Sequence, residues 1–207
     1  MVAAMAPCRL YLKLPAGPSA ALETSVAKAM DEADVACILL CSDGAPIDSA
    51  WDARLREITR EREVAFLIEN DAERAERIGA DGVHVAADVS LYRRAREHLD
   101  QRTIIGAGCI ASRHEAMVMA ELGADYIAFG AFFTSSVKPK AVVASLDVLQ
   151  QARRQTQLPI VAIGGITVEN GEQLLQAGAD ALAVISGVFS ATDIEQTARQ
   201  FSVLADR

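Results

Sequence analysis

The sequence predicts an α/β protein, a (β/α)8 barrel that forms a single domain over residues 1–207. Eight short and nearly continuous apolar runs alternate with amphipathic segments, which is typical of parallel strands covered by helices on both faces. Eight such units in 207 residues match a compact barrel. The alternative, a doubly wound open sheet, usually has a glycine-rich turn after its first strand, and RLYLKLPAGPS offers none. No shift in composition indicates a second domain.

The apolar runs give the strands in order. They are RLYLKL (9–14), ACILLC (36–41), VAFLI (64–68), GVHV (82–85), TIIGAG (103–108), DYIAFG (125–130), PIVAIGG (159–165) and ALAVIS (181–186). Between them, apolar residues recur every three or four positions in 19–33, 50–63, 112–123 and 169–178, and this spacing predicts helices.

A weak internal repeat supports this order. RIGADGVHV, ELGADYIAF and QAGADALAV each pass from a helix through Gly-Ala-Asp into a strand. The glycines of the repeat, Gly79, Gly123 and Gly178, are predicted to end helices in the left-handed conformation. The aspartates Asp81, Asp125 and Asp180 then lie at strand starts, the end of a barrel that serves stability rather than chemistry, so we expect structural roles for them.

Charge and cysteine content restrict the partners. A formal net charge of −8 argues against nucleic acid or an anionic membrane as the main partner, because both need a broad basic face. The four cysteines have no CxxC spacing, and Cys37 and Cys41 lie in an apolar run, which favours buried thiols. No segment reaches the roughly 18 apolar residues of a membrane span. We expect a cytoplasmic protein, and the sequence leaves a homo-oligomer open.

Two strands end on small residues. Gly164 and Gly165 follow the seventh predicted strand, and Ser186 and Gly187 follow the eighth. In a barrel these ends lie side by side at the catalytic face, where glycine lets backbone N–H groups approach an anion and a following helix adds its positive end. The sequence therefore predicts a phosphate site, one that an acidic protein can build without basic side chains.

Three segments resemble the thiamine phosphate synthase superfamily, which includes the thiazole tautomerases. They are AFLIENDAERAERIGADGVHV, ELGADYIAFGAFFTSSVKPK and LPIVAIGGITVENGEQLLQAGADALAVISGVF. The resemblance runs from about residue 36 onward. Members of that family are (β/α)8 barrels, and the synthase joins a hydroxymethylpyrimidine diphosphate to a thiazole phosphate. Diphosphate leaves with Mg²⁺, and the thiazole nitrogen captures the resulting pyrimidine cation.

The resemblance implies roles for several residues. It implies that the glycines and serine at the last two strand ends hold the thiazole phosphate together with Ser135, and that Lys138 grips the departing diphosphate. A fixed cation there would stabilise the charge that develops on the leaving group. It implies that Asn70 and Asp71 contact diphosphate and Mg²⁺, although the same pair also suits a helix N-cap. The family's second metal ligand aligns with Val89, or with Asp88 if this chain has a one-residue deletion relative to the family. We favour Asp88.

The chain departs from the family on the diphosphate side. Where the family has a Gln, an Arg and a Lys after its second strand, this chain has Leu39, Cys41 and Asp43. Gly108 and Ile110 stand where the family's fifth strand has a Ser and a His. Losing cations aimed at a leaving diphosphate would slow the reaction by orders of magnitude. A cation on the first strand, Arg9 or Lys13, is a potential replacement.

These observations support a synthase of this family that acts on small phosphorylated heterocycles with Mg²⁺, or a divergent version of it. The alternatives are a protein that binds thiazole phosphate or thiamine phosphate without catalysis, a thiazole tautomerase, and another phosphate-binding barrel enzyme such as a phosphosugar isomerase. Ile110 weighs against the tautomerase, which uses a histidine there. Of the three histidines, His84 is expected to be a core residue, and His98 and His114 to face solvent.

Overall fold

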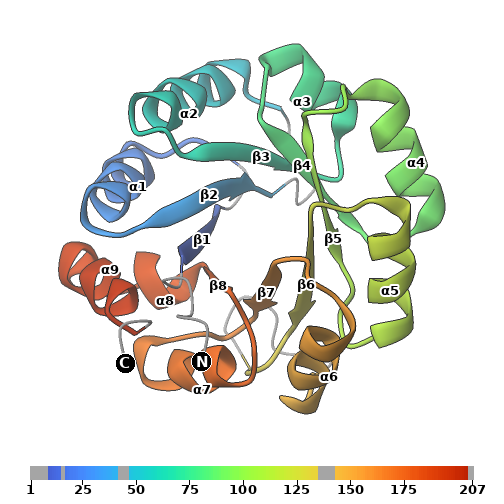
Figure 1. Ribbon diagram of the computed structural model, residues 1–207. Helices are drawn as coiled ribbons and strands as arrows, with labels where there is room; N and C mark the ends of the chain where they lie inside the picture. The colour runs from blue at the N-terminus through green and yellow to red at the C-terminus, as the bar shows by residue number, and fades with distance from the viewer. Residues whose placement is uncertain (1–8, 15–16, 42–46, 135–142, 205–207) are drawn as a thin grey trace.

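The computed structural model describes residues 9–14, 17–41, 47–134 and 143–204. The strands are β1 (Arg9–Leu14), β2 (Val35–Leu40), β3 (Ala65–Glu69), β4 (Gly82–Ala86), β5 (Ile104–Gly108), β6 (Tyr126–Gly130), β7 (Ile160–Ile163) and β8 (Ala181–Val184). All pair in parallel with their sequence neighbours, and β8 pairs with β1, which closes the barrel. Figure 1 shows this ring with the helices outside it. The predicted fold class is confirmed.

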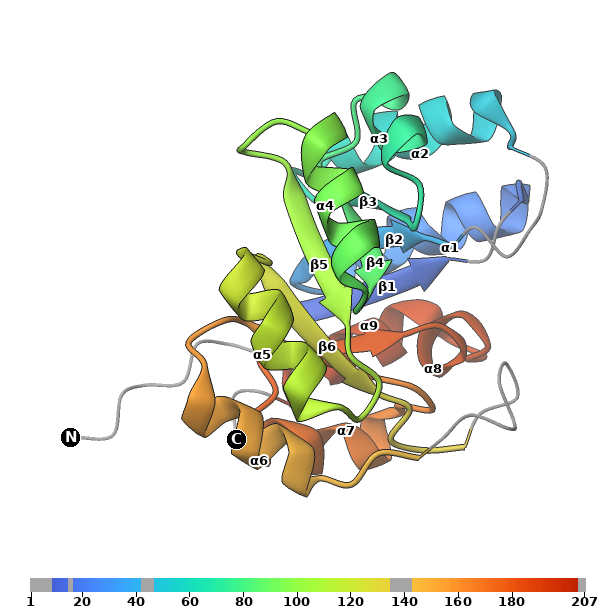
Figure 2. The same cartoon turned by 90° about the vertical axis from the view of Figure 1, so that its right-hand side faces the viewer.

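The helices follow the strands in alternation. They are α1 (Ala20–Glu32), α2 (Ser49–Glu61), α3 (Ala72–Ile78), α4 (Val89–His98), α5 (Arg113–Leu122), α6 (Asp147–Gln155), α7 (Val168–Gln176), the short α8 (Ser186–Phe189) and α9 (Ile194–Ser202). In Figure 2 the strand arrows point away from the N-terminus, toward the side that carries α8. No helix of the described residues is long and apolar enough to cross a bilayer.

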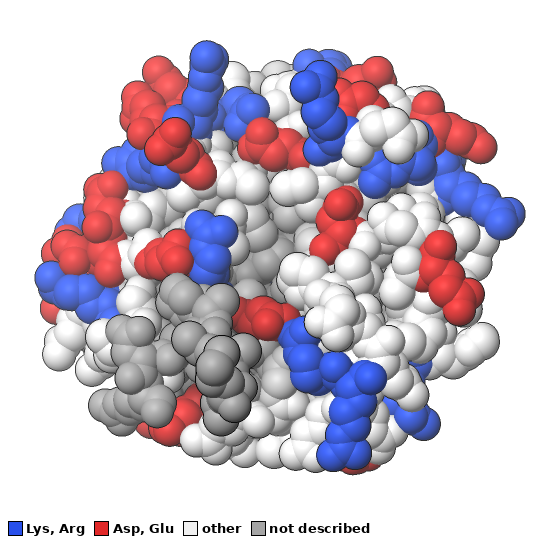
Figure 3. Space-filling view, viewed as in Figure 1, with Lys and Arg blue, Asp and Glu red and all other residues white. Residues whose placement is uncertain are grey.

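The Gly-Ala-Asp repeat builds the amino-terminal face of the barrel. The backbone N–H groups of Phe66, Ile105 and Ile160 donate to the carboxylates of Asp81, Asp125 and Asp180, respectively, at 2.7–2.8 Å. Arginines from α2, α4 and α6 pair with the same carboxylates, and Arg9 pairs with Asp34 in the same way. Figure 3 shows the acidic and basic side chains interleaved on this face. Each aspartate therefore holds two neighbouring strands in register, as expected of a structural residue.

Two apolar clusters stabilise the fold. The larger one lies between the strands and the helices and includes Leu12, Phe66 and Phe129. The smaller one fills the inside of the barrel and includes Tyr11, Leu39, Tyr126 and Val161. Inward side chains of such a barrel form layers from alternate strands. The strand register places Lys13, Glu69, Gly108 and Ile163 in the layer at the carboxyl end, above a layer of Leu39, His84, Ala128 and Ala183.

Candidate active site at the carboxyl ends of the strands

The ends of β7 and β8 present unpaired main-chain amides. Within the described residues, the backbone N–H groups of Gly164, Gly165, Ser186 and Gly187 donate to no other group. Gly164 and Gly165 have φ values of 98° and 66°, which L side chains rarely adopt. The amides predicted for a phosphate are thus available at neighbouring strand ends.

Close packing is a second reason for glycine at this edge. A Cβ on Gly165 would lie 2.5 Å from the carbonyl oxygen of Phe133, in the segment that follows β6. The N–H groups of Phe132 and Phe133 donate to the carbonyls of Ile163 and Gly164 at 3.2 and 3.1 Å. Phe132 and Phe133 are therefore fixed against the end of β7. Ser135 and Lys138, predicted for phosphate and diphosphate, follow Thr134 in the sequence but lie outside the described residues.

Asn70 and Asp71 connect β3 to α3. Asn70 has a φ of 54°, and its side-chain oxygen accepts from the N–H of Ala86 at the end of β4, at 3.0 Å. Asp71 is the N-cap of α3 and accepts from the N–H of Arg74 at 2.9 Å. Asp71 thus has the N-cap role that the sequence offered as the alternative, whereas Asn70 instead links the ends of β3 and β4. They lie at the carboxyl end of the barrel, where the resemblance also places a diphosphate and a metal.

Asp88 is likewise a helix cap. One oxygen of its carboxylate, Oδ1, accepts from the N–H groups of Ser90 and Leu91 at 2.8 and 2.9 Å, and from the Ser90 hydroxyl. These hydrogen bonds, led by the one from the hydroxyl, lower the pKa of the carboxyl. Among the described residues no three His, Cys, Asp or Glu side chains gather closely enough to form a metal cluster. Magnesium needs only one or two carboxylates when phosphate oxygens supply other ligands. The second oxygens of Asp71 and Asp88 suit that ligand set.

The described positions where the chain departs from the family lie in or just after β2 and β5. Leu39 and Cys41 are buried, with exposed fractions of 1% and 4%, and Asp43 lies outside the described residues. Ile110 is 59% exposed and has a φ of 50°, an unfavourable conformation for a β-branched side chain. An apolar side chain is thus held in a strained conformation at the mouth of the barrel, where such strain tends to mark functional positions.

Of the two replacement cations considered, only Lys13 points into the barrel. Arg9 lies at the opposite end, where it pairs with Asp34 and is half exposed. Nζ of Lys13 lies 3.1 Å from Oε1 of Glu69, and the two side chains are 9% and 18% exposed. Because Glu69 compensates the charge of Lys13, Lys13 is a poor substitute for a cation that must bind diphosphate. The sequence did not point to Glu69, because Lys13 and Glu69 lie 56 positions apart.

His84 ends a chain of hydrogen bonds across the barrel. Its Nδ1 lies 2.9 Å from the hydroxyl of Tyr126, which in turn lies 2.7 Å from the hydroxyl of Tyr11. Burial, with a smaller contribution from Lys13, lowers the pKa of His84 to about 4, so the ring is neutral at pH 7. Burial also raises the pKa values of both tyrosines, which keeps them protonated. The network therefore holds a neutral imidazole beneath the mouth.

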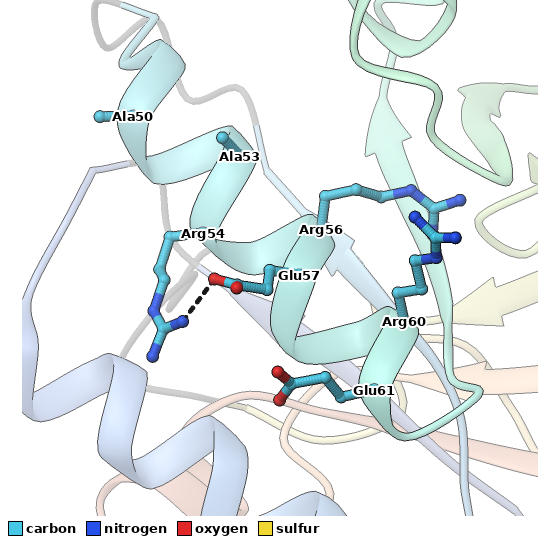
Figure 4. A pocket seen from close by; sticks show the side chains of 7 residues that line it. All are labelled: Ala50, Ala53, Arg54, Arg56, Glu57, Arg60 and Glu61. Atoms are coloured by element: carbon cyan, nitrogen blue, oxygen red, sulfur yellow. Dashed lines mark hydrogen bonds and ion pairs between the residues drawn. The ribbon is translucent and has the colours of Figure 1, made fainter.

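A hollow elsewhere on the surface is not a comparable site. It lies over α2 and is lined by alanine, arginine and glutamate side chains, and Arg54 pairs there with Glu57 (Figure 4). None of the predicted site residues lines it.

This chain is similar to known proteins in sequence and in fold. A family model described as thiamine monophosphate synthase matches residues 16–188. A thiamine-phosphate synthase of Rhodospirillum centenum is 43% identical over 189 residues, which cover 90% of this chain and 91% of that protein. One of Azoarcus is 40% identical and covers 94% and 96% of the two chains.

Among solved structures, a thiamine phosphate pyrophosphorylase from Pyrococcus furiosus superposes with a TM-score of 0.82 at 28% identity, and covers 96% of this chain and 95% of that one. An orotidine 5'-phosphate decarboxylase from Pyrococcus horikoshii has a TM-score of 0.70 at 14% identity, over 96% of this chain and all of that one, and shares only the fold.

Proposed function

Because this chain belongs to the thiamine monophosphate synthase family, we propose that it joins a hydroxymethylpyrimidine diphosphate to a thiazole phosphate and releases diphosphate. The observation that carries the proposal is the group of unpaired amides at the ends of β7 and β8. In this proposal residues 1–207 act as one domain in the cytoplasm, on small phosphorylated heterocycles.

The thiazole phosphate is the substrate that these amides suit. The backbone N–H groups of Gly164, Gly165, Ser186 and Gly187 lie at two adjacent strand ends and donate to no described group. Main-chain dipoles fixed in this way bind a phosphoryl group without a basic side chain. We place Ser135 as a further hydroxyl donor to the same phosphate. We place the thiazole ring toward the barrel axis, where its nitrogen would meet the pyrimidine.

The diphosphate leaves from the side formed by β3 and the segment after β6. We assign Lys138 to the oxygens that gain charge as the bond breaks, with the amide of Asn70 as a second contact. Asp71 and Asp88 each keep one carboxylate oxygen that accepts no bond within the described residues, and we assign these to Mg²⁺. When bound, the cation neutralises the departing diphosphate.

A second function is favoured by the side chains at β2 and β5. Leu39, Cys41 and Gly108 bring no cation or hydroxyl to the diphosphate side, and the charge of Lys13 is already paired with Glu69. A protein that binds thiazole phosphate or thiamine phosphate without turnover would keep the amides and lack these groups. The two functions share one site and differ in whether diphosphate is released.

Release of diphosphate separates the two functions. The purified protein is given both substrates with Mg²⁺, and inorganic diphosphate is measured against time, while calorimetry follows the binding of thiazole phosphate alone. Release that requires both substrates supports the synthase. Binding of thiazole phosphate with no release contradicts it and supports the binding protein. If the lost cations alone limit the rate, the double variant Cys41→Arg/Asp43→Lys releases diphosphate faster than the natural chain.

A further inference from the structure

We propose that Asp52 and Arg74 are positioning residues, which hold the turn between β3 and α3 so that one carboxylate oxygen of Asp71 stays available to Mg²⁺. The inference deepens the proposed function and rests on it, because Asp71 is one of the metal ligands assigned there. Asp52 lies on α2 and Arg74 on α3, and neither touches a substrate in the proposed function. Both act through Asp71, which is the N-cap of α3.

The two residues connect α2 to the first turn of α3. Nε and Nη2 of Arg74 donate to the two carboxylate oxygens of Asp52 at 2.9 and 2.5 Å. The side chains of Arg74 and Asp52 are 7% and 1% exposed, so water does not compete for these hydrogen bonds. A guanidinium that binds a carboxylate through two parallel bonds is restrained in orientation as well as in distance. The ion pair therefore restrains residue 74 relative to α2.

The backbone of Arg74 transmits this restraint to Asp71. The N–H of Arg74 donates to Oδ1 of Asp71 at 2.9 Å, and the N–H of Ala75 donates to the Asp71 carbonyl at 3.1 Å. Oδ2 of Asp71 accepts no hydrogen bond within the described residues. Because Oδ1 is held by the first turn of α3, the orientation of that turn sets the direction of Oδ2. Arg74 thus binds Asp71 through its backbone and α2 through its side chain.

Asn70 holds the other side of the same turn. Its side-chain oxygen accepts from the N–H of Ala86, at the end of β4, at 3.0 Å. The helix that follows, α3 (Ala72–Ile78), has only seven residues, and a helix this short depends on tertiary contacts for its stability. The turn is therefore held between β4 on one side and α2 on the other, and the contact with α2 includes the Asp52–Arg74 pair.

A buried ion pair is an expensive way to join two helices. Apolar side chains of similar volume often stabilise a protein as well or better, because two buried ions lose their hydration. Apolar contacts, however, have little directional preference, whereas two parallel hydrogen bonds favour one relative orientation. The specific contribution of Asp52 and Arg74 is therefore orientation, and the functional group that lies next to the oriented turn is the carboxylate of Asp71.

The test measures how much Mg²⁺ strengthens the binding of inorganic diphosphate. Diphosphate is titrated by calorimetry with Mg²⁺ present and again with EDTA in its place, and the natural protein is expected to bind it more tightly with Mg²⁺. The double variant Asp52→Leu/Arg74→Met should weaken binding with Mg²⁺ about tenfold, as the loss of a group that orients a metal ligand does. Binding without Mg²⁺, and binding of thiazole phosphate, should stay unchanged. The double variant keeps the net charge, so a change in the overall field does not explain the result.

Asp71→Asn is the matched control variant. Asparagine is as good an N-cap as aspartate but lacks the charge of the carboxylate, so this variant should lose the gain from Mg²⁺ and keep α3. Adding Asp52→Leu/Arg74→Met to Asp71→Asn should have no further effect on diphosphate binding, because residues that act through one another are not additive.

Arg74→Lys keeps the proposal testable if the double variant does not fold. Lysine keeps the charge opposite Asp52 but cannot form two parallel hydrogen bonds, so part of the gain from Mg²⁺ should be lost. A gain that survives both variants would overturn the proposal, as would an equal loss of thiazole phosphate affinity or a further loss in the Asp71→Asn background. No gain in the natural protein would overturn it together with the metal assignment. Absence of diphosphate release from the two substrates, with the gain present and lost as expected, would contradict the synthase function but leave the positioning role intact.

Discussion

Gly108 and His84 come from adjacent strands and fit against each other: a Cβ at position 108 would lie 2.9 Å from Nε2 of the imidazole. His84 is 8% exposed and its ring is held by the Tyr126 hydroxyl, so the ring has little freedom to move aside. We expect Gly108→Ala to cost about 1–3 kcal/mol in the free energy of unfolding, as overpacking does. Urea denaturation measures this, and His84→Ala in the same background should recover part of the loss. Purely additive effects would contradict the contact.

The buried imidazole predicts a pH-dependent stability. The pKa of His84 is about 4 in the folded protein, against 6.5 for the free side chain. Between these values the unfolded chain binds a proton that the folded one does not, so stability decreases as the pH falls from 6.5 to 4. The full effect is about 3 kcal/mol from this one residue. Unfolding of the natural protein and of His84→Gln should converge over this interval. A constant difference between the two would exclude the shift.

The ion pair between Asp52 on α2 and Arg74 on α3 is nearly free of solvent. The two side chains are 1% and 7% exposed and share two hydrogen bonds of 2.9 and 2.5 Å. Asp52→Ala leaves an uncompensated guanidinium and should cost about 3–5 kcal/mol. Asp52→Leu/Arg74→Met removes both charges and should cost much less. Thermal and urea unfolding compare the variants. If the double variant were as unstable as the single one, packing rather than charge would explain the loss.

The aspartates of the amino-terminal face stabilise the barrel mainly through the backbone. Asp81 accepts from the N–H of Phe66 at 2.8 Å and from Arg56, whose side chain is 28% exposed. Asp81→Ala leaves the N–H of Phe66 without its acceptor and should cost about 1–3 kcal/mol. Arg56→Met removes only a partly exposed ion pair and should cost less than about 1 kcal/mol. Equal losses in urea unfolding would mean that the ion pair dominates.

Most of the fold could be predicted from the sequence because each strand is a continuous apolar run between helices and turns. The eight strands therefore begin and end within about two residues of the predicted positions. Gly79 and Gly123 cap helices in the left-handed conformation, as the repeat predicted. Side-chain contacts between different strands could not be predicted in this way. Lys13 meets Glu69, and His84 is uncovered by Gly108, only because strand register and barrel stagger bring distant positions into neighbouring layers.

The phosphate-binding role of the amides at the ends of β7 and β8 can be tested separately from the backbone strain that a glycine substitution causes. Gly165 has a φ of 66°, and a Cβ there would lie 2.5 Å from the carbonyl oxygen of Phe133. We expect Gly165→Ala to move this turn, to lose at least 1 kcal/mol of stability and to weaken thiazole phosphate at least tenfold.

Gly178 provides the matched control, because it has a φ of 111° and lies in the turn between α7 and β8, where a Cβ would lie 3.1 Å from Arg153 Cβ. Gly178→Ala should therefore destabilise the protein while leaving the affinity unchanged. Calorimetry and urea unfolding of both variants separate the two effects. If both variants lost affinity in proportion to their stability, global destabilisation would account for the loss. A loss of affinity confined to Gly165→Ala would instead locate the phosphate at the amides, since strain at either glycine destabilises the barrel but only one of them lies at the carboxyl ends of the strands.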